Sequence, residues 1–374
     1  MNPHPPRLRI RFAVLMMPVV AAAVLALANS CAGGVTSGTP ADPLGAEIAR
    51  WNTFIQADTA RDDNSAQVRA SSSPALTSAA VALAHGRREL ALLRLAAART
   101  PLAALRSTRE HPAAGRSNAA FDAEWTRMRG VLRGRLSPAE SRALANLHPA
   151  AVRAIAEAAL PQVRILFDAA PDYAHSTLPE YGLSYVGEAV AQDQFIDWSR
   201  TLTEPGAGAE PPFRSIAPEI ETLQARMLAV YRPPVSIERH PEFINASSVL
   251  KEARELDAAG LRHGALLRYL QGVLRFQPLR DPPPAFDSLR TPATLRAFAA
   301  RIDRAGVDHG IARVFLELAQ ADMDDTTRGA AHATAAAVAA EVLPRYFAAL
   351  APAPPAAARP PAEVTVTLVR WPYT

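Results

Sequence analysis

Tyrosines, acids and a histidine are concentrated in residues 168–198, which read DAAPDYAHSTLPEYGLSYVGEAVAQDQFIDW. Aromatic rings beside polar groups are typical of a pocket that binds a sugar or a peptide. Two carboxylates at a suitable separation could in addition cleave a glycosidic bond by acid–base catalysis. The candidate ligand-contact residues are Asp172, Tyr173, His175, Glu180, Tyr181, Tyr185, Glu188 and Asp193.

These residues are expected on a polar loop at 171–182 and on the helix that follows it. Ser184, Glu188 and Gln192 recur every four residues, so they share one face of that helix. A purely structural alternative stays open, in which the tyrosines seal a helix bundle and the acids meet the arginines of residues 87–135.

The charge distribution along the chain bears on that alternative. Residues 87–135 hold eleven arginines and four acids, whereas residues 168–221 hold ten acids and two arginines. The two segments could pack together and neutralise each other, or the acidic one could present a face to a partner.

No sequence motif assigns catalysis to the chain. Ser248-Val-Leu-Lys251 matches S-x-x-K of the penicillin-recognising enzymes, but Lys251 is the sole lysine, so the K-T-G strand of those enzymes is missing. The zinc, di-iron and haem motifs H-E-x-x-H, E-x-x-H and C-x-x-C-H are also missing. The sequence therefore predicts no catalytic, cofactor-binding or metal-binding residues.

Helical periodicity dominates after residue 43. Residues 78–100 are predicted as one amphipathic helix that Pro101 ends or turns. Ser137-Pro138-Ala139-Glu140 and Thr291-Pro292 each indicate a helix start. Further helices are expected around 43–60, 117–134, 149–168, 183–201, 218–231, 241–259, 261–276, 307–321 and 328–350.

The predicted fold is all-α, an irregular multi-helix bundle or a short helical-hairpin array with one C-terminal β-like tail segment. Residues 251–278 resemble one tetratricopeptide unit, but a shift of 34 residues finds no second unit. The predicted organisation is a signal peptide (1–30), a flexible tether (31–42), helical lobe 1 (43–200), a loop or linker (201–215), helical lobe 2 (216–350), and a Pro/Ala-rich spacer with the strand-like tail VTVTLVRWPYT (351–374).

The amino terminus has the pattern of an export signal. Three arginines precede an apolar run of sixteen residues, 12–27, which would reach about 24 Å as a helix, short of the ~30 Å hydrocarbon core. Ala28-Asn29-Ser30-Cys31 then resembles the lipobox of bacterial lipoproteins, although that family favours leucine where Ala28 stands. The resemblance implies lipidation of Cys31. One alternative is cleavage after Ala28 with soluble secretion, and another is that the apolar run is retained as an anchor.

These patterns lead to one expected function and one alternative. We expect a lipid-anchored helical protein of the bacterial cell envelope, in the periplasm or on the cell surface, that acts as a binding or scaffolding module. Its partners would be the membrane, through the lipid anchor, and an envelope protein or glycan. Acids and bases are nearly balanced once the leader is removed, so no nucleic-acid partner is expected. The alternative is an extracytoplasmic glycan-directed hydrolase that uses carboxylates in 172–197.

Overall fold

The computed structural model describes residues 42–60, 62–136, 144–203, 208–233, 237–280, 284–325 and 332–351, all within one compact unit that begins at Ala41. The regular structure of these ranges is helical, and their β structure is an isolated antiparallel bridge between Phe213 and Leu350. The predicted all-α class is confirmed. The leader, Cys31, the capping box at 137–140 and the strand-like tail lie outside the described residues. The division into two lobes at 201–215 stays a prediction.

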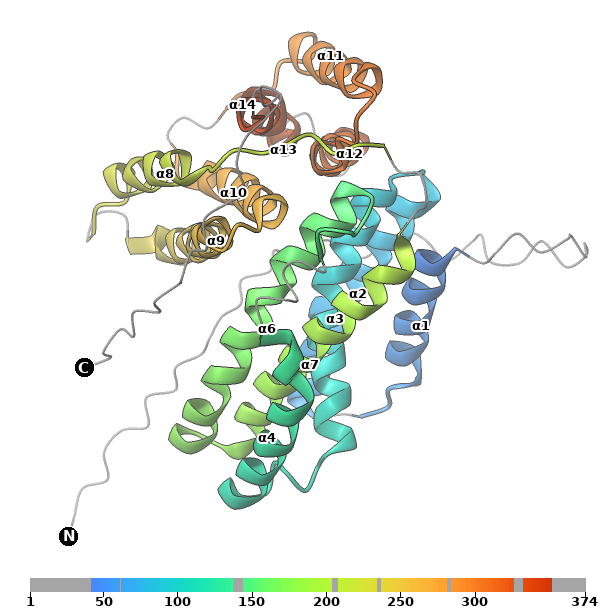
Figure 1. Cartoon of the computed structure of the whole chain (residues 1–374), viewed down its shortest axis with the longest axis vertical. Helices are drawn as coiled ribbons and strands as arrows, with labels where there is room; N and C mark the ends of the chain where they lie inside the picture. Colours follow the sequence, from blue (N-terminus) through green and yellow to red (C-terminus); the bar gives the residue numbers. More distant parts are fainter. Residues whose placement is uncertain are drawn as a thin grey trace, which may run out of the picture. The chain divides into compact units, whose positions relative to one another are not determined.

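The helices before residue 200 are α1 (Pro43–Ala57), α2 (Asp63–Ala84), α3 (Arg88–Glu110), α4 (Asn118–Leu132), α6 (Ala150–Ser176) and α7 (Pro179–Ser199). α7 packs along both α6 and α3, α2 covers α3, and α4 lies against α6 and α7 (Figure 1). Short 3-10 turns, η1 (Arg133–Leu136) and η2 (Arg200–Leu202), follow α4 and α7. This group of helices holds every candidate ligand-contact residue.

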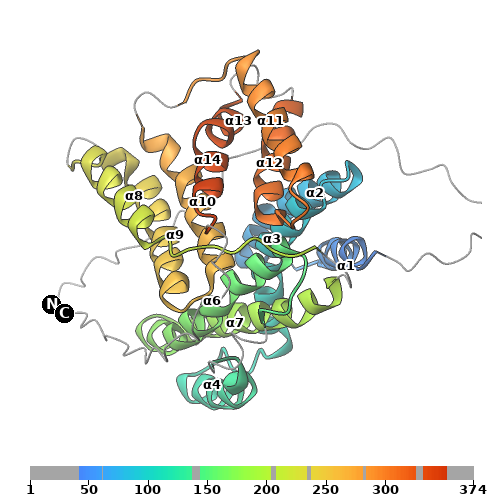
Figure 2. The same ribbon diagram turned by 45° about the horizontal axis from the view of Figure 1, so that its top comes forward.

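The later helices are α8 (Ala217–Val230), α9 (His240–Ala258), α10 (Arg262–Phe276), α11 (Arg290–Arg304), α12 (Gly310–Asp324), α13 (Ala333–Ala337) and α14 (Leu343–Ala348). Shorter turns are η3 (Ile237–Arg239), η4 (Gln277–Leu279) and η6, a π-helical turn (Val338–Val342). α9 and α10 form a helical hairpin, and α8 lies beside α9 (Figure 2). Gly260 makes the turn of this hairpin with φ +77°, a left-handed value that glycine adopts readily.

Two predicted boundaries in 78–110 are wrong. Gly86, with φ +71°, separates α2 from α3, so residues 78–100 are not one helix. Pro101 does not end α3, which continues to Glu110. The leucines beyond the proline explain why: Leu102 and Leu105 are buried. Their burial contributes about 1.5–3 kcal/mol each, which offsets the ~3 kcal/mol that an interior proline costs.

The predicted loop at 171–182 is also wrong. α6 runs to Ser176 and α7 begins at Pro179, so two residues connect the helices. Pro171 lies inside α6, whose small buried residues continue past it and allow α7 to approach closely. A Cβ atom on Gly182 of α7 would lie 2.5 Å from the Cβ of Ala174. Tertiary packing of small residues thus keeps both helices regular where composition indicated a loop.

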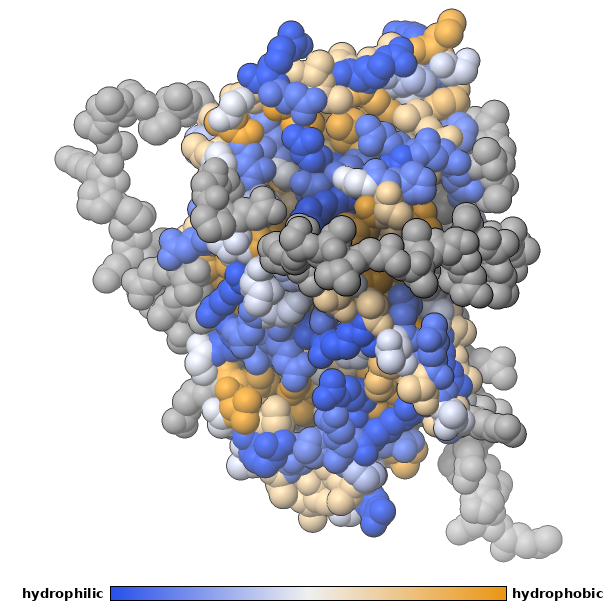
Figure 3. All heavy atoms as spheres, turned by 90° about the vertical axis from the view of Figure 1, so that its right-hand side faces the viewer, coloured by the Kyte–Doolittle hydropathy of each residue, from blue (hydrophilic) through white to orange (hydrophobic). Residues whose placement is uncertain are grey.

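The surface gives no sign of a membrane span within the described ranges. No helix there combines the length and the apolar character needed to cross a bilayer. On the face shown in Figure 3, hydrophilic residues are interleaved with smaller apolar groups. Such a mixture is normal for a folded protein, because apolar atoms contribute more than half of the accessible surface.

We predict that Gly182→Ala destabilises the fold by about 1–3 kcal/mol, because the new methyl group would overlap atoms of α6 and α4. Urea denaturation measures the free energy of unfolding. Gly130→Ala in α4 is the matched control, since nothing lies within 4 Å of a Cβ there and helix propensity favours alanine by ~1 kcal/mol. Equal stability of the two variants would contradict the close packing of α6 and α7.

Candidate functional site

The structure brings only part of the predicted ligand-contact set together. Asp172, Glu180 and Tyr181 are exposed on the outer surface. His175 lies 2.9 Å from Asp122 of α4 through its Nε2 atom, and this pair is half-exposed. None of these four predicted residues lines the groove described below.

Tyr173, Tyr185 and Glu188 form a second group, on the side where α6 meets α7. The two tyrosine rings stack with centroids 4.2 Å apart and an interplanar angle of 18°. Burial, together with the neighbouring Tyr173, raises the pKa of the Tyr185 hydroxyl. Burial also raises the pKa of Glu188 to about 7. Tyr173 and Tyr185 therefore help to seal the α6–α7 contact, whereas Tyr181 is exposed.

Asp193 points to a different side of α7 from Glu188, because residues five apart on a helix are rotated by about 140°. Asp193 pairs with Arg135 of η1, and Arg135 also lies 2.7 Å from Asp197. Burial opposes the charge of Arg135, but these two carboxylates raise its pKa. Arg135 thus joins the arginine-rich and acidic segments.

Other arginines of residues 87–135 find their partners elsewhere. Arg99, which is buried, lies 3.1 Å from Glu47 of α1, and Arg109 lies 2.6 Å from Asp58. The hydrogen bond from Arg109 lowers the pKa of Asp58 to about 2. Neutralisation between the two oppositely charged segments is therefore one part of a wider set of ion pairs.

A groove of about 280 Å³ lies between α3, α4 and α7, and Asp193 is one of its lining residues. Its floor and walls also include Trp51 of α1, which is 2% exposed. The lining contains Arg106, Ser107, Glu110, His111, Glu124, Arg127, Met128, Val131, Val186, Gly187, Val190, Ala191 and Gln194. Most of the α7 lining is small and apolar, with Asp193 and Gln194 as its polar members, whereas α3 and α4 supply most of the charged residues.

Two ion pairs lie on the walls of the groove, one on α3 and one on α4, and Nδ1 of His111 lies 3.9 Å from Glu124. On α3 the Nε atom of Arg106 donates to Glu110 at 2.7 Å, and both side chains are about half exposed. On α4 Arg127 donates two hydrogen bonds to Glu124, at 2.9 and 2.6 Å, which lower the pKa of that carboxyl. Exposed pairs within one helix contribute only about 0.3–0.5 kcal/mol, so a bound ligand could replace either partner of the half-exposed Arg106–Glu110 pair at small cost. Glu124 is 14% exposed and is held more firmly.

Sequence reasoning missed most of this groove. Asp193 was the one predicted ligand-contact residue in its lining. Arginine is abundant throughout the chain, so the arginines of α3 and α4 do not stand out in the sequence. The usable signal was the spacing of Arg106 with Glu110 and of Glu124 with Arg127, which predicts pairs on a helix surface.

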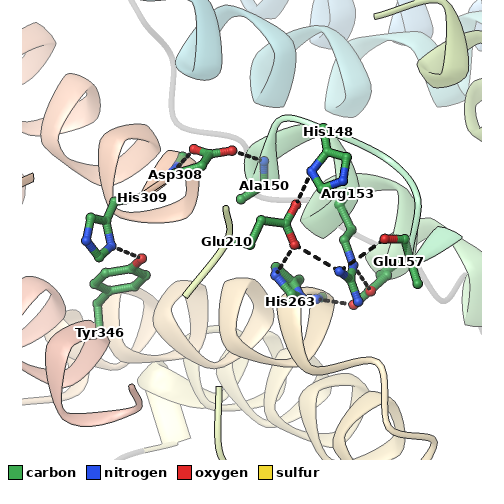
Figure 4. Close-up of polar contacts among 12 residues, drawn as sticks. His148, Ala150, Arg153, Glu157, Glu210, His263, Asp308, His309 and Tyr346 are labelled. Carbon is green, nitrogen blue, oxygen red and sulfur yellow. Dashed lines mark hydrogen bonds and ion pairs between the residues drawn. The ribbon is translucent and has the colours of Figure 1, made fainter. Parts of the chain in front are cut away.

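A cluster of buried charges lies elsewhere, around Glu210, whose side chain is 8% exposed (Figure 4). Oε2 of Glu210 lies 2.8 Å from Nε2 of His263 on α10 and accepts a hydrogen bond of 2.9 Å from Arg153 on α6. Oε1 lies 3.0 Å from Nδ1 of His148. Burial alone would raise the pKa of Glu210, but the hydrogen bond and charge of His263, with Arg153 and His148, lower it.

Arg153 is shared with a second carboxylate, that of Glu157. Glu157 is 1% exposed and accepts hydrogen bonds of 2.8 Å from Nε of Arg153 and from the backbone N–H of Gly264. Within the described ranges, no three His, Cys, Asp or Glu side chains are arranged to hold a metal ion. The arrangement is suited to holding α6 and α10 together through charge-assisted hydrogen bonds.

The cluster fixes an extended crossing segment, residues 208–216, that leads into α8 (Figure 1). Phe213 in this segment packs edge-on against the ring of His263, at 4.9 Å, and against Tyr346 of α14, at 5.8 Å. The backbone of Arg214 donates to Ala349 at 3.1 Å. Tyr346 is in turn 2.7 Å from Nδ1 of His309. Glu210 therefore anchors a backbone that bridges α6, α10 and α14.

We predict that Glu210→Gln lowers the free energy of unfolding at pH 7 by about 3 kcal/mol, because it removes one partner from a buried ion-pair cluster. Since the folded pKa of Glu210 is lowered, its stabilisation is present above the usual glutamate pKa, ~4.3, and is lost as the pH falls through the folded value. Urea denaturation at pH 7 and at pH 3 measures both effects.

Glu238→Gln is the control for this variant, because Glu238 is 66% exposed and its partner Arg239 is 3.9 Å away. It should change stability by less than about 0.5 kcal/mol at either pH. A loss in Glu210→Gln that is no larger than in this control would show that the Glu210 ion pairs do not hold the crossing segment.

Comparisons with known proteins supply no relative from which a function could be transferred. No family model matches the chain, and neither a curated protein nor a solved structure is matched. The groove, the buried cluster and the leader are therefore the features of the chain that bear on its function.

Proposed function

We propose that this chain is a lipid-tethered binding module of the bacterial cell envelope that holds a small polar ligand in the groove between α3, α4 and α7. The groove carries the proposal, because it combines a volume of about 280 Å³ with an apolar floor and charges of both signs. Ligand sites typically have such a concave, partly apolar lining with few polar groups, and their volumes begin near ~300 Å³. The ligand would be an envelope component of small size.

The anchor proposed for this module is a lipid on Cys31. The support is the leader, with its arginines, its apolar run and the sequence Ala28-Asn29-Ser30-Cys31. Acyl chains on a cysteine would place the helical body outside the cytoplasm at a membrane surface, where two or more chains give stable attachment.

Glycan hydrolysis is the second candidate. It is favoured by the raised pKa of Glu188, about 7, which would allow this carboxyl to act as a general acid near neutral pH. A second carboxylate would have to reach the same side of α7, and Asp193 does not share that face. Glycan turnover by the purified protein that disappears in Glu188→Gln, with the fold retained, would favour this candidate over the binding module.

We predict that Cys31→Ser releases the protein from bacterial membranes, because the serine cannot carry the thioether-linked lipid. Membrane fractionation followed by mass spectrometry of the amino terminus measures the change. After cleavage of the leader, the wild-type protein should begin at Cys31 and carry a lipid on that residue. A Cys31→Ser protein that is cleaved and membrane-bound to the same extent as wild type would exclude the lipid anchor.

We predict that Val131→Trp blocks the groove. Val131 is 60% exposed and lies in the groove lining on α4, so an indole there would fill the space without entering the core. Ligand-observed NMR on the full-length protein in detergent, with a fixed panel of amino acids, dipeptides, monosaccharides and disaccharides, measures binding. Wild-type protein should bind at least one compound, and Val131→Trp should lose it.

Val81→Trp is the matched control, because Val81 is 44% exposed on α2 and is not part of the groove lining. It should retain the binding of wild-type protein. Binding that persists in Val131→Trp, or a panel without any bound compound, would contradict a ligand site in this groove.

A further inference from the structure

Arginines from two helices meet over one face of α10, outside the groove lining. α10 contacts α8, η6 and α14 (Figure 1). Tyr269 and Phe276 of α10 are seven residues apart, so they share one face of the helix. Arg345 of α14 donates a hydrogen bond of 3.0 Å to the Tyr269 hydroxyl. Arg226 of α8 lies with its Cζ atom 5.5 Å from the centre of the Phe276 ring.

Glu341 of η6 is the carboxylate that these arginines share with Arg280. Its Oε1 atom accepts a hydrogen bond of 2.8 Å from Arg280, and its Oε2 atom accepts one of 2.7 Å from Arg345. Burial alone would raise the pKa of Glu341, but the hydrogen bond and the charge of Arg345 lower it. The charges of Arg280 and Arg226 lower this pKa further. We call Arg226, Arg280 and Arg345 the arginine cluster.

The arginine cluster has a surplus of two positive charges, because three guanidiniums act on one carboxylate. Glu219 of α8 also acts on Tyr269, but Arg214 pairs with that glutamate and balances it. Among the described residues, no carboxylate lies within ion-pair distance of Arg226, which is half-buried. A partly desolvated guanidinium without a counter-charge is unfavourable, so the surplus favours the binding of an anion.

The cluster also has hydrogen-bond donors to spare. A guanidinium has five N–H donors, yet Arg280 uses only its Nη1 atom, for Glu341 and Gln277, within the described part of the chain. The side chains of Arg280 and Arg345 are 25% and 24% exposed, so a ligand can reach them from solvent. Planar guanidiniums with free donors bind oxyanions, often through two hydrogen bonds at once.

The size of the charge surplus favours one class of oxyanion. A carboxylate brings one negative charge, whereas a phosphate monoester brings about 1.5 to 2 at pH 7. One phosphate group therefore matches the surplus of the cluster. The backbone gives a separate indication, since Glu341 lies on a π-helical turn. Single π-helical turns inside helices are frequently found at functional sites.

We propose that Arg226 and Arg280 bind a phosphate group over this face of α10, with Arg345 beside them. The phosphate would be free in solution or part of a lipid headgroup. This site goes beyond the proposed function, because none of its residues lines the groove between α3, α4 and α7.

The test is isothermal titration of the full-length protein, in a non-ionic detergent at pH 7, with inorganic phosphate. Sodium acetate is the comparison anion with a single charge. We expect phosphate to bind at least about tenfold more tightly than acetate, because it compensates both surplus charges. No binding of phosphate, or equal affinity for the two anions, would overturn the proposal.

Arg226→Gln should weaken phosphate binding at least about tenfold, because it removes the unpaired guanidinium. Arg129→Gln is the matched control. Arg129 of α4 also lies over an aromatic ring, with its Cζ atom 4.9 Å from the centre of the Trp125 ring, but far from α10 in the chain. Circular dichroism checks that each variant is folded. An unchanged affinity in Arg226→Gln, or an equal loss in Arg129→Gln, would overturn the proposal.

Glu341→Gln should have the opposite effect and tighten phosphate binding at least about threefold. This carboxylate competes with the ligand for Arg280 and Arg345, and glutamine removes its negative charge. A cluster that serves only to hold η6 against α10 would bind phosphate in neither protein. Weaker phosphate binding in a folded Glu341→Gln protein would contradict the assignment of Arg280 to the site.

Two further measurements identify the source of the phosphate and separate this site from the groove. sn-Glycerol 3-phosphate carries the phosphate of a lipid headgroup without acyl chains. Binding at least tenfold tighter than that of inorganic phosphate would support a headgroup, whereas equal or weaker binding would support free phosphate. Val131→Trp should leave phosphate binding unchanged even if it abolishes binding in the groove. A loss of phosphate binding in Val131→Trp would place the anion in the groove and overturn the proposal.

Discussion

A buried carboxylate is the constraint on which the arrangement of this fold depends. Glu210 is 8% exposed, and a charge at that depth is tolerated only beside compensating groups. His263 of α10 and Arg153 of α6 supply them, so these two helices and the crossing segment must keep their relative positions. Phe213 then fills the space beside His263 and Tyr346, which extends the same constraint to α14.

Two other features set the shape of the groove: small residues that allow close helix packing, and ion pairs between the helices. Gly187 lets α7 approach α3 so closely that a Cβ atom there would lie 2.9 Å from Ala104. Arg135 holds η1, the turn that follows α4, to α7 through two carboxylates. The Arg106–Glu110 pair on the α3 wall is half exposed and only weakly held by comparison. A rigid frame with exchangeable surface charges is the arrangement expected of a preorganised binding site.

Prediction from the sequence succeeded where apolar spacing was strong and failed where proline or small residues dominated. α10 was expected at 261–276 and is observed at Arg262–Phe276, because its leucines recur on one face. The loop expected at 171–182 is helical, because packing of alanine and glycine between α6 and α7 outweighs the effect of Pro171. Of the candidate site, Asp193 alone was anticipated in the groove lining, since the other walls come from helices far away in the chain.

The sequence by itself determined the all-α class, because helical periodicity and local end signals act over a few residues and need no knowledge of distant contacts. Only the tertiary structure decided which charges meet. Glu210 and His263 are separated by more than fifty residues, as are Arg135 and Asp193, and no local pattern marks either pair. These pairs form because burying an unpaired charge costs free energy. That cost arises only when the helices pack and remove the charged groups from water.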